Sequence, residues 1–318
     1  GNMCKVLVTD GMNKNAIDRL RKFNIDVEHK FYDGMELGEK LKDKDIVVIR
    51  SKNVITKEII DKACEGNTLK LIIRSGVGLD NIDVKYANEK GIKVLNTPNA
   101  STRSVAELTI GQIITLSRFI NIANVTMRDG QWNKKQYVGT EIFGKTLGII
   151  GLGRIGKTVA NMAYNLGMNV IYYDILGKID GYENYKFCTF EEVLKNADFI
   201  TIHIPLERGQ GYLIGTKEFN MMKDRVYFIN HARGGLVCEK ALIKALDSGK
   251  VEAAALDVYE KEPNVNLELV NHPMVSPTPH LGASTVEAQE RIGREIVKII
   301  YNFLLENEII DNDMQIAQ

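Results

Sequence analysis

Short apolar runs alternate with longer amphipathic segments along most of this 318-residue chain. Residues 45–50 (DIVVIR) are apolar at almost every position, whereas residues 239–250 (EKALIKALDSGK) repeat apolar side chains at helical spacing. Strands that are apolar on both faces are typical of parallel sheets covered by helices. The pattern therefore predicts an α/β protein built from βαβ units. The expected strands are residues 4–10, 45–50, 69–75, 92–97, 146–151, 169–174, 198–204, 225–230 and 253–258.

The length of the chain and one turn-rich break predict two domains. A chain of 318 residues exceeds what one core usually holds. The break PNAST (98–102) precedes an S-x-x-E capping box, Ser104 with Glu107, and a second such pair, Ser284 with Glu287, precedes the last helical pattern. We therefore expect a domain of residues 100–282 inserted into a second domain of residues 1–99 and 283–318, each a doubly wound parallel-sheet unit.

The composition argues against several classes of partner. Lys plus Arg and Asp plus Glu number 41 each, so the zero net charge argues against nucleic acid and against an anionic membrane surface. The four cysteines form no C-x-x-C pair, which favours reduced thiols in a cytoplasmic protein and no zinc site. No His/Cys/Asp cluster has metal-ligand spacing and no apolar run has membrane-spanning length.

The stretch GLGRIG (151–156) is the G-x-G-x-x-G pattern of dinucleotide-binding loops. It follows an expected strand and opens a helical pattern, as such a loop requires. Gly151 would allow a tight turn, Gly153 would let the backbone approach a pyrophosphate, and Gly156 would let helix and strand pack closely. A glycine turn with a purely structural role is the alternative, but the surrounding strand and helix favour a cofactor site and a Rossmann fold for residues 100–282.

An acidic residue completes this pattern. Asp174 ends the next expected strand, where a carboxylate can accept hydrogen bonds from a ribose diol. The same charge would repel a 2′-phosphate, so the sequence predicts NAD rather than NADP.

Three ionisable residues follow later strands of the same domain. Arg233, Glu262 and His280 lie after successive strands, whose carboxyl ends meet at one edge of a parallel sheet. Arginine can bind a carboxylate through two hydrogen bonds, histidine can exchange a proton near neutral pH, and a carboxylate behind the imidazole favours its charged form. Together they match hydride transfer to or from a 2-hydroxy or 2-oxo acid. Each alone has an ordinary alternative: a surface ion pair, a solvated glutamate and a packed histidine.

Several spaced motifs resemble the D-isomer-specific 2-hydroxyacid dehydrogenase family over nearly the whole chain. They are RSGVGLDNID (74–83), GLGRIG, HIPL (203–206), ARGG (232–235), LDVYEKEP (256–263) and PHLGAST (279–285). The resemblance implies that Arg233, Glu262 and His280 are catalytic, that residues 1–99 and 283–318 form the substrate domain, and that the enzyme is a homodimer joined through its cofactor domains. It implies NAD contacts, in addition to the glycine loop and Asp174, at Val77, Arg154, Ile155, Ile204, Pro205, His231, Ala232, Asp257, Gly282 and Ala283.

Within this family the sequence is most similar to the branch that oxidises D-3-phosphoglycerate to 3-phosphohydroxypyruvate, the first step of phosphorylated serine synthesis. That reaction is the expected activity. The expected substrate contacts are Arg50, Ser51, Lys52, Arg74, Ser75, Gly76, Val77, Gly78 and Lys134, with Lys134 acting either in its own subunit or in the partner subunit. Solvated surface lysines are the alternative for Lys52 and Lys134. Many members of this branch carry C-terminal regulatory domains, whereas this sequence ends soon after Glu306, so serine feedback through such a domain is not expected.

Two other functions are compatible with the same scaffold. A glyoxylate or hydroxypyruvate reductase would take an unphosphorylated substrate and give Arg50 and Lys52 no role. An NAD(H)-sensing corepressor would need peptide-binding grooves and extended tails, and the sequence shows no such tails.

Overall fold

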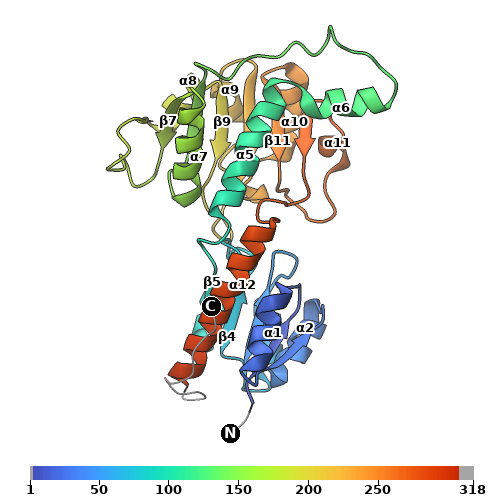
Figure 1. The fold of residues 1–318 in the computed structure, drawn as a ribbon, viewed down its shortest axis with the longest axis vertical. Coiled ribbons are helices and arrows are strands. Elements are labelled where there is room, and N and C mark those ends of the chain that lie inside the picture. Colours follow the sequence, from blue (N-terminus) through green and yellow to red (C-terminus); the bar gives the residue numbers. More distant parts are fainter. Residues whose placement is uncertain (1–2, 308–318) are drawn as a thin grey trace. The chain divides into compact units, whose positions relative to one another are not determined.

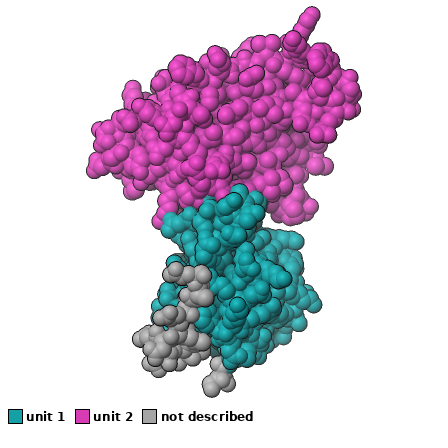
Figure 2. Space-filling model, in the orientation of Figure 1, with its two compact units in different colours: residues 1–101, 283–318 teal, residues 102–282 magenta. Residues whose placement is uncertain are grey.

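A computed structural model describes residues 3–307 and divides the chain into two compact units (Figure 2). Unit 1 consists of residues 1–101 and 283–318, and unit 2 consists of residues 102–282. The residues at the two ends, 1–2 and 308–318, belong to the predicted substrate domain but lie outside the described part. Each unit is built on one parallel sheet, so the prediction of an α/β protein with two parallel sheets is confirmed.

Unit 1 contains a five-stranded parallel sheet in the order β2-β1-β3-β4-β5 (Figure 1). Residues that alternate along each strand point to opposite faces, and helices cover both faces. α1 and α12 pack on one face with Val6, Val48 and Ile73, while α2, α3 and α4 pack on the other with Leu7 and Val47. The elements are β1 (Lys5–Val8), α1 (Lys14–Lys22), β2 (Asp26–His29), α2 (Gly34–Lys40), η1 (Leu41–Asp43), β3 (Ile46–Ile49), α3 (Lys57–Cys64), β4 (Leu71–Arg74), α4 (Val84–Glu89), β5 (Lys93–Asn96) and α12 (Val286–Glu306).

Unit 2 contains a seven-stranded parallel sheet in the order β12-β11-β10-β9-β6-β7-β8. The helices α5 and α7 cover one face, and α8, α9 and α10 cover the other. The elements are α5 (Thr102–Ser117), α6 (Ile120–Arg128), β6 (Thr146–Ile150), α7 (Arg154–Asn165), β7 (Asn169–Tyr173), β8 (Lys186–Phe187), α8 (Phe190–Asn196), β9 (Phe199–Ile202), α9 (Thr216–Met221), β10 (Val226–Asn230), η2 (Gly234–Leu236), α10 (Glu239–Ser248), β11 (Val251–Leu256), α11 (Leu267–Val270) and β12 (Val275–Pro277).

The helix α6 differs from the other helices of unit 2. It has no buried residue, and together with the segment that follows it extends away from the layers of sheet and helix (Figure 1). Large apolar side chains are exposed along this arm: Ile120, Val125, Met127, Trp132, Val138 and Phe143.

The two predicted capping boxes are wrong in position. Ser104 lies inside α5, which begins two residues earlier, and its side chain is buried. The cap of α12 is Thr285 rather than Ser284, and its hydroxyl accepts the Ala288 N–H. Ser and Thr can both cap a helix, so spacing alone could not show which of the adjacent residues Ser284 and Thr285 caps α12.

Among the described residues, none of the helices is both long and apolar enough to cross a membrane.

Candidate active site

The carboxyl edge of the seven-stranded sheet collects most of the residues that the sequence singled out. The chain leaves β6 toward β7 on one side and returns to β9 on the other, so the direction of winding reverses between these strands. Ligands of open α/β sheets bind at such a reversal, beyond the carboxyl ends of the strands. The glycine loop follows β6, Asp174 follows β7, Ile204 and Pro205 follow β9, His231 to Arg233 follow β10, Asp257 and Glu262 follow β11, and His280 follows β12.

The glycine loop has the close approaches that a dinucleotide fold requires. Gly151 has a φ of +97°, and a Cβ there would lie 2.4 Å from the His203 carbonyl oxygen. A Cβ on Gly156 would lie 2.1 Å from the Gly151 carbonyl oxygen, so helix α7 can pack only on glycine. By contrast, a Cβ on Gly153 would meet nothing within 4 Å. Gly153 precedes the first turn of α7, whose free N–H groups favour an anion, so this open space fits a pyrophosphate.

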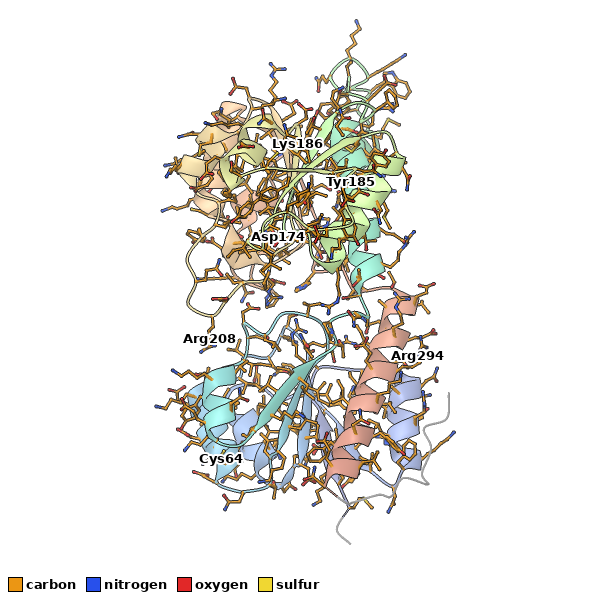
Figure 3. All side chains as sticks on the ribbon, turned by 90° about the vertical axis from the view of Figure 1, so that its left-hand side faces the viewer. Cys64, Asp174, Tyr185, Lys186, Arg208 and Arg294 are labelled. Carbon is orange, nitrogen blue, oxygen red and sulfur yellow. The ribbon has the colours of Figure 1, made fainter. Side chains whose placement is uncertain are left out.

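Asp174 (labelled in Figure 3) lies just beyond the carboxyl end of β7, the strand that pairs with β6 before the glycine loop. One carboxylate oxygen accepts the Leu152 N–H at 2.8 Å, and the other accepts the Leu176 N–H at 2.9 Å. These two bonds fix the carboxylate and leave each oxygen a second lone pair for a ribose hydroxyl. The residues present therefore fit NAD, and this negative charge would oppose the additional phosphate of NADP.

His280 and Glu262 form a hydrogen-bonded pair in unit 2. The Nδ1 atom of His280 lies 2.7 Å from Oε1 of Glu262, and both side chains are about one-third exposed, at 30% and 33%. Since the carboxylate can only accept, Nδ1 carries the proton, and Nε2 is the nitrogen that does not bind Glu262. Such a pair can exchange a proton with a hydroxyl or carbonyl group through Nε2.

Charges around Glu262 keep it ionised. Burial alone would raise its pKa, but the hydrogen bond from His280, the His280 charge, the Tyr259 N–H and the Arg233 charge together lower the pKa below its usual value. The Arg233 charge therefore acts on Glu262, while the contact within the predicted catalytic set is the hydrogen bond between His280 and Glu262.

The backbone that carries His280 is held in an unusual conformation by Asp257. His280 has a φ of +54°, in the left-handed region that non-glycine residues rarely adopt. Asp257 is buried, and its carboxylate accepts the Thr278 hydroxyl at 2.7 Å and the N–H groups of Leu281 and Gly282 at 2.6 and 2.9 Å. Burial raises the pKa of Asp257 despite these donors. Asp257, which the resemblance gave as an NAD contact, thus anchors the His280 turn in this structure.

Two histidines lie side by side where β9 and β10 end. Ile202 pairs with Asn230, so His203 and His231 are the next residues of neighbouring strands. Nδ1 of His231 lies 3.0 Å from the Thr109 hydroxyl, while its Nε2 is buried without a hydrogen-bond partner. Burial lowers the pKa of His231 to about 4; burial of the His203 ring, with His231 beside it, lowers the pKa of His203 to about 3. Both rings are therefore neutral near pH 7.

The predicted phosphate-binding residues lie in unit 1, at the carboxyl ends of β3 and β4. Arg50 donates from Nη2 to Oε1 of Gln289 in α12 at 2.8 Å, and the Lys52 ammonium lies 4.3 Å from the centre of the Phe31 ring. Asp10, after β1, is the acidic member of this cluster. Burial raises its pKa, although Arg50, Lys52 and Arg74 oppose the shift. Sequence reasoning missed Asp10 and Gln289, because no spacing in the chain connects them to β3.

The glycine-containing loop after β4 is held by Arg74 itself. The buried Arg74 guanidinium donates to the carbonyl oxygens of Ser75 and Gly78, so it supports the loop from within. The Gly76 N–H binds the Thr97 hydroxyl at 2.7 Å, and the Ser75 hydroxyl is buried without a partner. Val77 is exposed at the tip of the loop. Ser51 is exposed and Ala283 packs against the unit 1 core.

The remaining predicted contacts lie in unit 2. Ile155, Ile204 and Ala232 are partly buried against its core, whereas Lys134 is exposed in the segment after α6. Within residues 3–307, no three His, Cys, Asp or Glu side chains are grouped so that they could hold a metal ion.

Comparison with known proteins identifies the family. The family described as D-isomer specific 2-hydroxyacid dehydrogenase, NAD binding domain, matches residues 110–282. A hydroxypyruvate reductase of Thermotoga maritima is 42% identical over 94% of this chain and 98% of its own length. The chain belongs to the D-isomer-specific 2-hydroxyacid dehydrogenase family. The resemblance inferred from the sequence is confirmed, and unit 2 contains the NAD-binding domain of this family.

Other relatives differ in length and in the name they carry. A D-3-phosphoglycerate dehydrogenase of Methanocaldococcus jannaschii is 44% identical over 96% of this chain, but the chain spans only 59% of that protein. Among solved structures, a D-lactate dehydrogenase from Aquifex aeolicus, complexed with NAD and lactic acid, is 31% identical with a TM-score of 0.84. It covers 94% of this chain, and 95% of its own chain is matched. The family therefore spans several substrates on one fold.

Proposed function

We propose that this chain is an NAD-dependent dehydrogenase that oxidises D-3-phosphoglycerate at C2 to 3-phosphohydroxypyruvate. The hydrogen-bonded pair of His280 and Glu262, 2.7 Å apart beside the NAD-binding loops of unit 2, carries the proposal of a 2-hydroxyacid dehydrogenase. The relatives named as phosphoglycerate dehydrogenases and the basic residues after β3 support the phosphorylated substrate. Unit 1 is proposed as the substrate domain and unit 2 as the cofactor domain.

Each residue of the pair has a distinct proposed role. Bound NAD would accept the hydride from C2 of the substrate. Nε2 of His280 takes the proton of the C2 hydroxyl, and Glu262 stabilises the imidazolium that results. The Arg233 guanidinium binds the substrate carboxylate through two hydrogen bonds, a geometry that a lysine ammonium cannot supply.

In the loop of Ser75 to Gly78, the amides of Val77 and Gly78 are proposed as a second site for the carboxylate. The Ser75 and Gly76 amides already donate to the Ile49 carbonyl oxygen and the Thr97 hydroxyl, whereas the Val77 tip is exposed. Arg50 and Lys52 are proposed to bind the substrate phosphate. The Arg50 hydrogen bond to Gln289 and the Lys52 contact with the Phe31 ring involve neutral partners, and Asp10 is the acidic member of this cluster.

A reductase of hydroxypyruvate is the second candidate. The Thermotoga maritima relative with that name matches along 98% of its length, more fully than the longer phosphoglycerate dehydrogenases do. Asp10 also favours it, because a carboxylate beside Arg50 and Lys52 weakens the attraction for a doubly charged phosphate.

Kinetics with three substrates separate the two candidates. NADH consumption is measured with 3-phosphohydroxypyruvate, hydroxypyruvate and glyoxylate. The proposal expects kcat/KM for 3-phosphohydroxypyruvate to be at least ~100-fold higher than for hydroxypyruvate or glyoxylate. This ratio corresponds to ~2.7 kcal/mol of transition-state stabilisation. Comparable values would assign the chain to the general 2-oxo-acid reductases. Lys52→Ala should raise KM only for the phosphorylated substrate. The control is Lys57→Ala: the Lys57 ammonium lies 5.2 Å from the Tyr86 ring centre, and its removal should leave KM unchanged for all three substrates.

We also propose that two chains associate through the arm formed by α6 and the segment after it. The exposed apolar residues of the arm, Trp132 and Val125 among them, are otherwise unfavourable in water. Sedimentation should then give about twice the 35.7 kDa mass of one chain. Lys134 lies in this arm and is proposed to reach the substrate of the partner subunit.

A further inference from the structure

The loop between β11 and α11 carries a buried tyrosine next to the proposed catalytic pair. Tyr259 stands three residues before Glu262, and its ring is 6% exposed. Its hydroxyl donates to the carbonyl oxygen of Thr278 at 2.7 Å and lies 3.1 Å from that of Leu256. Since a phenol has one proton, the shorter contact to Thr278 is the principal hydrogen bond.

The Thr278 carbonyl oxygen is also part of the turn that holds His280. It accepts the His280 backbone N–H at 3.0 Å, so the tyrosine hydroxyl and the His280 amide share one acceptor. This turn places His280 at a φ of +54°, a conformation that the surrounding contacts must maintain. The hydroxyl of Tyr259 therefore helps to hold the strained His280 turn through its hydrogen bond to the Thr278 carbonyl oxygen.

Tyr259 also contacts the other member of the pair. Its backbone N–H lies 3.5 Å from Oε2 of Glu262, the carboxylate oxygen that does not bind His280. The neighbouring Glu260 N–H donates to the buried carboxylate of Glu239 in α10 at 2.8 Å, which fixes the loop to unit 2. Through its side chain Tyr259 thus binds the Thr278 carbonyl oxygen, which also accepts the His280 N–H, and through its own backbone N–H it contacts the carboxylate of Glu262.

We propose that Tyr259 is a positioning residue that sets the distance and angle between His280 and Glu262. The inference rests on the proposed function only in giving the pair a catalytic role. Burial raises the pKa of the phenol, so the hydroxyl remains a proton donor over the whole range of pH in which a dehydrogenase is assayed. Without this hydroxyl, the Thr278 carbonyl would lose a buried donor and the His280 turn would relax.

The test removes the Tyr259 hydroxyl and keeps the aromatic ring. Tyr259→Phe should lower kcat about tenfold, because a small displacement of an acid/base group is costly, while the Kd for NADH stays within about twofold. The limb of the pH–rate profile that reports the acid/base group should move in the same direction as in Glu262→Gln. The control is Tyr185→Phe, because Tyr185 is also 6% exposed and its hydroxyl donates to the Asn161 side chain. Its kcat and pH profile should match those of the wild-type protein.

Two kinds of result would overturn the inference. A Tyr259→Phe protein with wild-type kcat and an unchanged pH profile would show that His280 and Glu262 keep their geometry without the Tyr259 hydroxyl. A variant that unfolds, or that loses NADH binding together with turnover, would show that the hydroxyl supports the unit rather than the pair.

A second readout does not depend on turnover. In NMR spectra of the protein without substrate, the His280 ring signals, assigned by their loss in His280→Asn, should shift in Tyr259→Phe and not in Tyr185→Phe. If the wild-type protein reduced no 2-oxo acid, the proposed function would fail, yet these signals would still report whether Tyr259 positions the ring. Unchanged His280 signals would contradict the positioning role itself.

Discussion

At the scale of single residues, the chain offers two histidines in similar hydrogen-bonded settings and only one at the proposed site. His280 binds Glu262 at 2.7 Å, and His272 binds Asp247 at 3.0 Å in the loop before β12. Replacement of each by asparagine therefore makes a matched pair. Both variants lose a hydrogen bond to an acidic side chain, and His272→Asn also loses the Nδ1 atom that accepts the Met274 N–H.

His280→Asn should lower kcat by roughly 10²–10⁴-fold, the usual contribution of a general acid/base, while the Kd for NADH changes by less than about threefold. His272→Asn should keep wild-type kcat. Steady-state kinetics and NADH fluorescence titration measure both quantities. If the His280→Asn protein were folded and turned over substrate normally, the catalytic role of His280 would be wrong.

The residues that the sequence could predict at this scale are those that belong to spaced motifs. Arg233, Glu262 and His280 each follow a strand, and the rule that strand ends meet at one edge brings them together. Tyr259 stands inside the same LDVYEKEP motif, but nothing in the chain shows that its hydroxyl reaches the Thr278 carbonyl oxygen. Contacts of this kind depend on the register of β11 and β12, which only the folded sheet defines.

At the scale of elements, two glycines of the same loop are constrained for different reasons, one by the packing of the fold and one by the space that a cofactor needs. Gly156 is enclosed by backbone, because a Cβ there would lie 2.1 Å from the Gly151 carbonyl oxygen. Gly153 is open, because a Cβ there meets no protein atom within 4 Å. Both positions belong to one motif, yet the structure gives them different physical constraints.

The same substitution at the two positions should therefore have different effects. Gly156→Ala should lower the free energy of unfolding by about 2 kcal/mol through overpacking. Gly153→Ala should unfold like the wild-type protein but bind NADH at least about tenfold more weakly, because the methyl group occupies the space open to the pyrophosphate. Gly211→Ala, also open within 4 Å, is the control for both. Equal stability of the Gly153 and Gly156 variants would contradict this assignment.

The strands that sequence reasoning missed are all at sheet edges. β2, β8 and β12 are terminal strands in their sheets, and their sequences are DVEH, KF and VSP. An edge strand has one neighbour and is partly exposed, so it needs neither length nor apolar residues on both faces. The nine expected strands were apolar runs, and eight of them are interior strands; β5 is the exception. Periodicity predicts long apolar runs, and these edge strands have two to four residues each.

At the scale of the whole molecule, the neighbouring histidines His203, which is half-buried, and His231, which is buried, link stability to pH. The pKa of His231 is about 4 and that of His203 is about 3 in the folded protein, against 6.5 in an unfolded chain. Between pH 6.5 and 4 the unfolded chain therefore binds protons that the folded chain does not. Stability is then lost as the pH falls, by about 3 kcal/mol from the buried His231 alone once the pH reaches its folded pKa.

Urea unfolding of wild type and His231→Asn at several pH values between 7.5 and 4.5 measures this linkage. Carboxylates also titrate toward the acid end, so the informative quantity is the difference in slope between the two proteins. At pH 5 the wild-type slope should exceed that of the variant by up to ~1.4 kcal/mol per pH unit, which corresponds to one proton fewer taken up on unfolding. The control His272→Asn, which removes a histidine outside this pair, should keep more of the wild-type slope than His231→Asn does. Parallel curves for wild type and His231→Asn would mean that His231 is already protonated in the folded protein, and that its unpartnered Nε2 has found a hydrogen-bond acceptor.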